Sequence, residues 1–175
     1  IGRVTGQSDS NAGLAFIGLV LSAIFFLSAT AIFARLAHET LGLQGARFAI
    51  ALMLVAPFAF FYTAVYTESL FLLEVVAAIW FARREQWWKA GIVAALASAT
   101  RLVGLAVIGG VLWAAFKRGV GLSRLIPLAA IGASGIIAFF LYLGYKVDNV
   151  FAYFDTQSQW GGWNEHVWFY VKLLL

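Results

Sequence analysis

Long uncharged runs dominate the sequence, and short polar or basic segments separate them. Residues 10–34, 48–67 and 125–145 contain no Asp, Glu, Lys or Arg. Each run is long enough to cross about 30 Å of hydrocarbon as an α-helix. Apolar side chains face every direction around these runs, as expected where lipid rather than water is the solvent. The pattern predicts an all-α fold, a polytopic transmembrane helical bundle.

The same pattern predicts the positions of the membrane spans. We expect helices at 12–34, 48–63, 67–82, 89–116 and 125–144, with the start of another at 167. No soluble domain or long linker interrupts them, so residues 1–175 form a single transmembrane domain. The chain begins at Ile1 and stops inside an apolar stretch at Leu175. We therefore expect a fragment of a longer chain, incomplete at both ends.

The segment 89–116 has two interpretations, because Arg101 lies near its middle. As one span, it divides the basic residues six against four across the membrane. As a two-helix hairpin broken near Arg101, it divides them eight against two, with only Arg3 and Lys146 on the minority side. The positive-inside rule favours the hairpin and makes the majority cytoplasmic. A broken helix at membrane depth also requires a surrounding protein or water-filled cavity near Arg101. The majority set is Arg35, Arg47, Arg83, Arg84, Lys89, Lys117, Arg118 and Arg124.

Composition supports a membrane protein. Hydrophobic residues make up 63% of the chain and charged residues 11%, and the mean hydropathy is +0.90. This leaves too little polar surface to cover a soluble globule. The net charge of +4 comes from basic residues at the ends of apolar spans, which is a topology signal and indicates no nucleic-acid partner. The absence of cysteine excludes disulfides, thiolate metal sites and cysteine nucleophiles in this segment, and we predict no metal site.

In the hairpin topology, the polar segments gather on the non-cytoplasmic side. Tyr66 and Glu68 lie in one of them, between two apolar helices. An ionisable group there is costly if it faces lipid, so Glu68 should face the bundle or a watery cavity. The alternative for Glu68 is an interfacial acid that caps a helix, beside an aromatic belt residue.

Arg101 is flanked on both sides by uncharged sequence. Its permanent charge and planar fork of donors suit a phosphate group, and a lipid phosphate is the natural anion at this depth. The alternative is an internal ion pair with Glu68 or Glu74. The two interpretations are compatible, since an acid can hold the guanidinium beneath a ligand. For Glu74 a buried ion pair is favoured over a catalytic role.

A third polar cluster lies between residues 148 and 163, and it includes Asp155, Gln157 and Trp160. Carboxylates and amides bind sugar hydroxyls, while indole rings stack on pyranose faces. The cluster therefore suits a sugar or acceptor site. The alternative is an amphipathic helix that lies in the membrane interface with tryptophan anchors.

At these residues the sequence resembles the PIG-V-like mannosyltransferases, which are related to GPI mannosyltransferase II and belong to the glycosyltransferase C superfamily. The most specific element is the run from Tyr66 to Phe71, which follows a proline and several aromatics. The resemblance extends from about residue 12 to residue 163. Its other elements are Trp87 leading into Thr100, Arg101 and Gly104, and Phe151 followed by Gln157 and Trp160.

The resemblance implies a glycosyltransferase C-like fold and transfer of a mannosyl or other hexosyl unit from a polyprenyl-phosphate donor, with inversion at the anomeric carbon. We expect Arg101, Glu68 and Tyr66 to bind the donor and its phosphate, and the third cluster to bind the sugar or acceptor. Such enzymes are similar in placing a catalytic aspartate in the first outer loop. Asp9 does not have that setting, so we expect the base upstream of residue 1 and a fragment inactive alone. The catalytic residue stays unassigned.

The resemblance also implies the surroundings of the enzyme. We expect an integral multi-pass protein of a bacterial or archaeal plasma membrane, or of the endoplasmic reticulum, with its active site on the non-cytoplasmic face. Its partners would be membrane lipid, the lipid-linked donor, and a glycan, glycolipid or protein acceptor. The sugar, the acceptor and any need for a divalent metal stay open. Alternatives are transfer of another sugar, such as arabinose or glucose, a transporter or flippase without such chemistry, and a structural subunit.

Overall fold

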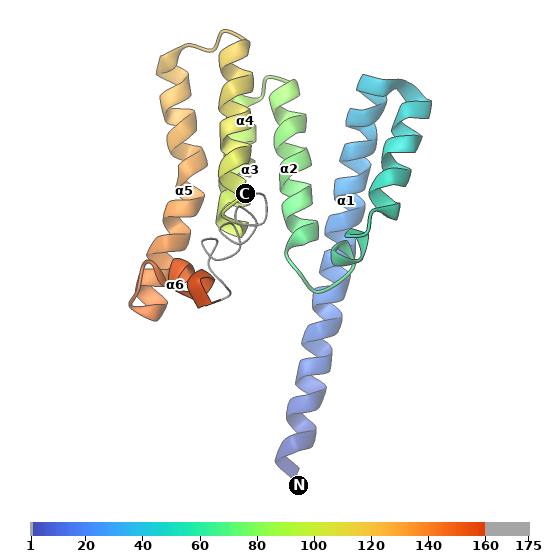
Figure 1. Ribbon diagram of the computed structural model, residues 1–175, viewed down its shortest axis with the longest axis vertical. Coiled ribbons are helices and arrows are strands. Elements are labelled where there is room, and N and C mark those ends of the chain that lie inside the picture. Colours follow the sequence, from blue (N-terminus) through green and yellow to red (C-terminus); the bar gives the residue numbers. More distant parts are fainter. Residues whose placement is uncertain (1, 160–175) are drawn as a thin grey trace, which may run out of the picture. The chain divides into compact units, whose positions relative to one another are not determined.

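The computed structural model describes the backbone of residues 2–159 and the side chains of residues 12–156. Every regular element in this part of the chain is a helix, which confirms the all-α prediction (Figure 1). The chain divides into two compact units, Ile1–Gly135 and Ile136–Leu175. The elements are α1 (Gly2–Val55), the 3₁₀ helix η1 (Ala59–Tyr62), α2 (Glu68–Arg83), α3 (Trp87–Thr100), α4 (Gly104–Lys117), α5 (Leu122–Val147) and α6 (Ala152–Gln159).

Helix α1 consists of two antiparallel helical sections separated by a kink at Gly42 (Figure 1). Gly42 has φ 71°, a left-handed value that glycine adopts without the cost of a side chain. The prediction that the first helix ends at residue 34 was wrong. Arg35 and the residues after it tolerate helical geometry, and Thr40 donates a hydrogen bond to the Leu36 carbonyl. The helix therefore continues until a residue changes the backbone direction.

The predicted helix at 48–63 was also wrong at its end, because the structure interrupts it after Val55. Pro57 lacks an N–H group and restricts the residue before it, so a helix cannot pass through this point without strain. The chain instead turns and forms the short helix η1. Its Tyr62 ring stacks on Phe26 of α1, with ring centroids 5.1 Å apart.

The segment 89–116 is a pair of helices, α3 and α4, in the arrangement of the hairpin (Figure 1). Residues 101–103 separate them, and Arg101 has extended backbone angles of φ −149° and ψ 142°. Helix α2 lies within one residue of the predicted 67–82. Helix α5 extends beyond the predicted 125–144 at both ends.

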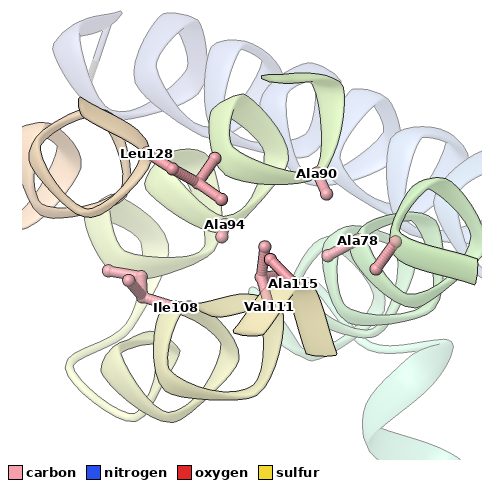
Figure 2. Packing of buried hydrophobic residues seen from close by; sticks show 8 residues of the cluster. Ala78, Ala90, Ala94, Ile108, Val111, Ala115 and Leu128 are labelled. Atoms are coloured by element: carbon pink, nitrogen blue, oxygen red, sulfur yellow. The ribbon is translucent and has the colours of Figure 1, made fainter. Parts of the chain in front are cut away.

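Small side chains form the core of the first unit (Figure 2). Ala90 and Ala94 of α3 are fully buried, so α3 presents little more than methyl groups to its neighbours. A Cβ atom at Gly135 of α5 would lie 1.8 Å from the Ala95 carbonyl oxygen, which shows how closely these helices approach. Close contact through small residues is typical of helix packing in membranes. The labelled core residues are Ala78, Ala90, Ala94, Ile108, Val111, Ala115 and Leu128.

Two helical stretches are long and apolar enough to cross a membrane, Ala12–Val55 and Leu122–Val147. In their most apolar windows only 17% and 11% of the residues are buried, whereas the core helix of a soluble protein is mostly buried. Helices α2, α3 and α4 are shorter than the roughly 20 residues that a single crossing needs. The apolar surface of the long helices is therefore available to lipid.

The helices of the first unit alternate in direction, so their connections fall at two ends (Figure 1). Residues 56–67 and 101–103 make connections at one end, and Gly42, residues 84–86 and residues 118–121 at the other. We call the latter the basic end. It carries the eight basic residues that the sequence assigns to one side: Arg35, Arg47, Arg83, Arg84, Lys89, Lys117, Arg118 and Arg124.

Polar contacts connect the helices at the basic end. An ion pair joins Arg84 to Glu39 at 2.7 Å, and the Arg83 guanidinium donates a hydrogen bond to the Thr40 hydroxyl at 2.7 Å. Arg118 pairs with Glu85. The Arg84 guanidinium also lies over the Trp80 ring, 3.2 Å from its centroid. These contacts are exposed, so each contributes modestly to stability.

Candidate active site at the opposite end of the bundle

Glu68 and Arg101 form an ion pair at the end of the first unit opposite the basic end. Arg101 Nη1 donates to Glu68 Oε1 at 2.7 Å. The Arg101 side chain is 39% exposed and the Glu68 side chain is 26% exposed. The pair is therefore partly shielded yet accessible to solvent. The Arg101 guanidinium carbon lies 5.9 Å from the centroid of the Phe71 ring, one turn along α2 from Glu68.

The local backbone places these two charges together. Glu68 is the first residue of α2, where the positive end of the helix dipole favours a carboxylate. Arg101 directly follows α3, and α4 begins at Gly104. A Cβ atom at Gly104 would lie 2.2 Å from the Ala97 carbonyl oxygen, so only glycine permits this close reversal. The sharp turn brings Arg101 and the N-terminus of α4 to the same place, and both present positive charge.

A second polar contact lies deeper between α2 and α3. The Thr100 hydroxyl is 3.0 Å from Glu74 Oε1 and 3.0 Å from the Leu96 carbonyl, so it can donate to either. The prediction of a buried ion pair for Glu74 was wrong, because the partner of Glu74 is the neutral Thr100 hydroxyl. Glu74 is recognisable in the sequence as an acid inside the predicted helix 67–82, but only the packing of α3 on α2 identifies Thr100 as its partner.

Three buried oxygen atoms along α2 have no hydrogen-bond partner among the described residues: Glu68 Oε2, Ser69 Oγ and Glu74 Oε2. Ser69 is fully buried, and Glu74 is 7% exposed. Buried polar atoms without partners are rare in folded proteins, and they often mark functional sites or positions for water. The polar character of this end therefore continues inward from the Glu68–Arg101 pair. Ser69 was missed by sequence reasoning.

Tyr66 is on the connection that precedes α2, as expected, but the residue is 59% exposed. Its ring packs edge-on against Phe61, with centroids 5.6 Å apart. Within the described residues no hydrogen bond joins Tyr66 to Arg101. The structure thus brings together two of the three residues predicted to bind the donor, and leaves Tyr66 at the rim of the same end.

The predicted sugar or acceptor residues belong to the second unit. Asp155 lies in the first turn of α6, where Asn149 Nδ2 donates to its Oδ2 atom at 2.7 Å. Asn149 Oδ1 in turn accepts a hydrogen bond from the Phe151 N–H. The turn therefore fixes the Asp155 carboxylate at the start of α6. The Gln157 side chain and Trp160 lie outside the described residues.

The first unit's site has a cation beside an acid, and this arrangement can bind an anion. Arg101 has five N–H donors, and Glu68 occupies only part of that fork. Across the described residues no group of three His, Cys, Asp or Glu side chains could hold a metal ion. The Asp9 side chain lies outside the described part of α1. The described residues thus offer a partner for phosphate and leave the catalytic base unassigned.

These features are those of a helical protein with two stretches long and apolar enough to cross a membrane, and with a charged site at a helix break opposite the basic end. The family model described as mannosyltransferase (PIG-V) matches residues 9–168. The chain belongs to this family, which makes it a membrane mannosyltransferase and favours an enzyme over a transporter or structural subunit. No curated protein and no solved structure matches the chain.

Proposed function

We propose that the protein transfers a mannosyl unit from a polyprenyl-phosphate donor to an acceptor on the non-cytoplasmic face of the membrane. The observation that carries this proposal is the Glu68–Arg101 ion pair at the break between α3 and α4. A break at this position exposes a permanent cation beside apolar helices, where a lipid-linked phosphate is the natural anionic ligand. Family membership supports mannose as the transferred sugar, and the Arg101 cation supports a donor that carries a phosphate.

Arg101 binds the donor phosphate through the part of its fork that Glu68 does not occupy. Negative charge develops on the phosphate oxygen as the sugar leaves it, and a fixed cation lowers the barrier to that step. The N-terminus of α4, which starts three residues later, adds a positive dipole. No described residue needs to donate a proton to the leaving group in this scheme, because a phosphate leaves as an anion.

Glu68 is a positioning residue in this proposal. An unpaired arginine side chain has several rotatable bonds and about 2 kcal/mol of rotamer entropy to lose on binding. The 2.7 Å contact with Glu68 removes much of that freedom before the donor arrives. The carboxylate also keeps the guanidinium charge partly compensated when the donor is absent. Removal of Glu68 should therefore weaken donor binding through Arg101.

The distribution of basic residues supports the proposed side of the membrane. The eight basic residues of the basic end are expected in the cytoplasm by the positive-inside rule, which leaves Glu68 and Arg101 at the non-cytoplasmic end. We propose that three residues of the second unit bind the sugar or the acceptor: Asp155, Gln157 and Trp160. The general base that accepts the acceptor hydroxyl proton is not assigned to any described residue.

The donor is tested with the intact protein reconstituted in sealed vesicles. We expect mannosyl transfer from polyprenyl-phosphate mannose, and no transfer when a soluble nucleotide-linked mannose is the only donor. The lipid-linked donor places its phosphate at the membrane depth of Arg101, whereas a soluble nucleotide sugar does not. Radiolabelled mannose recovered in the acceptor measures both. Transfer from the nucleotide sugar alone would contradict the proposed donor.

A further inference from the structure

A groove lies between α2 and α4 and reaches the basic end. Its volume is about 590 Å³, within the range of pockets that hold a drug-sized molecule. The body of the groove is apolar, with Val75, Ile79 and Val107 among its lining residues. Gly110 and Ala114 of α4 contribute almost no side-chain volume, which leaves room for an extended chain.

Three cations line the same groove: Arg83, Lys117 and Arg118. Arg83 is hydrogen-bonded to a neutral hydroxyl, and Arg118 pairs with Glu85. Lys117 has no ion pair within the described residues, and its ammonium group lies 5.5 Å from the centroid of the Trp113 ring. The groove thus has uncompensated positive charge beside an apolar body. A tryptophan beside a lysine at this level is typical of the membrane interface.

The wider charge of this end has the same sign. The described basic end holds eight basic residues, and only two acidic residues, Glu39 and Glu85, accompany them. Anionic headgroups in the cytoplasmic leaflet attract basic residues close to a membrane surface. A neutral helix of protein would leave this charge without a partner, whereas a lipid phosphate would compensate it.

We propose that this groove binds one anionic glycerophospholipid, with its phosphate against Arg83, Lys117 and Arg118 and an acyl chain along Gly110 and Ala114. This site is distinct from the Glu68–Arg101 site, which lies at the opposite end of the bundle. The lipid joins α2 to α4 at the basic end. Since α2 also carries Glu68 and α4 follows Arg101, the lipid stabilises the two helices that frame the proposed active site.

Cysteine labelling tests the proposal, because residues 1–175 contain no cysteine. A Cβ atom at Gly110 has no neighbour within 4 Å, so Gly110→Cys places a thiol in the groove without a clash. Gly109→Cys is the matched control, because Gly109 has equal space and lines a different groove that holds no charged residue. The intact protein is delipidated in detergent and labelled with N-ethylmaleimide, with either phosphatidylglycerol or phosphatidylcholine of the same acyl chains.

We expect phosphatidylglycerol to slow labelling of Gly110→Cys at least fivefold relative to phosphatidylcholine, and to leave Gly109→Cys unchanged. Lys117→Gln should raise the phosphatidylglycerol concentration needed for half protection about fivefold, and Arg83→Gln should add a similar factor. Equal protection by the two lipids, or equal protection at Gly109, would overturn the proposal. A Gly110→Cys thiol that resists labelling without lipid would also overturn it, because another protein segment would then fill the groove.

Discussion

Arg101→Ala is expected to reduce turnover of polyprenyl-phosphate mannose by about 10²- to 10³-fold in the intact enzyme, the usual cost of removing one donor that stabilises transition-state charge. Among the described side chains of the first unit, residues 12–135, the guanidinium is the one cation that does not lie at the basic end. The measurement is kcat and KM for the lipid-linked donor.

Two variants separate charge from geometry in this prediction. Arg101→Lys retains a positive charge but loses the planar fork, so we expect an activity between those of wild type and Arg101→Ala. Arg47→Ala removes a cation from the basic end and should leave turnover unchanged. If Arg101→Ala turns over the donor as fast as Arg47→Ala while both remain folded, Arg101 does not bind the phosphate.

Gly104→Ala is expected to lower both the thermal stability and the activity of the protein. The added Cβ atom would lie 2.2 Å from the Ala97 carbonyl oxygen and 2.5 Å from the Ser98 nitrogen, and both are backbone atoms that cannot rotate away. Helices α3 and α4 must then separate, at a cost of about 1–3 kcal/mol or more. Because Arg101 lies between these helices, the same shift moves the guanidinium away from Glu68.

The matched control for Gly104→Ala lies in the same helix. Gly110→Ala adds a methyl group where no atom lies within 4 Å, and alanine favours a helix over glycine by about 1 kcal/mol. Thermal unfolding in detergent should therefore shift in opposite directions for the two variants. A Gly104→Ala protein as stable as Gly110→Ala would show that the tight reversal between α3 and α4 is not required.

The sequence favoured the hairpin that carries the site over the alternative of a single span. Counting basic residues on the two sides of the segment 89–116 favours a break near Arg101, and the structure has its break at residues 101–103. The count works because loop charge is selected for topology, independently of how the helices pack. Glu68 as a partner of Arg101 was likewise one of the two acids that the sequence offered.

Other features needed the three-dimensional structure. The end of the first helical section of α1 depends on Gly42, whose left-handed backbone cannot be distinguished in sequence from that of other glycines in apolar runs. Pro57 is visible in the sequence, but the apolar residues around it favour a helix that continues to residue 63. In the structure the helix ends at Val55, before the proline. The contact of Thr100 with Glu74 joins residues 26 positions apart, so it depends on how α3 packs on α2.

The groove at the basic end was invisible to sequence reasoning for a similar reason. Arg83 and Lys117 were interpreted only as topology signals, since each closes an apolar helix. Their approach to a common groove depends on α2 and α4 lying side by side with small residues between them. Topology and lipid binding are compatible uses of the same charges.

The central claim is that Glu68 acts on the donor phosphate through Arg101, and a double-mutant cycle tests it most directly. The measurement is kcat/KM for polyprenyl-phosphate mannose in wild type, Glu68→Gln, Arg101→Gln and the double variant. We predict that Glu68→Gln lowers kcat/KM about tenfold in the wild-type background and causes no further loss in the Arg101→Gln background. An equal loss in both backgrounds would contradict the account.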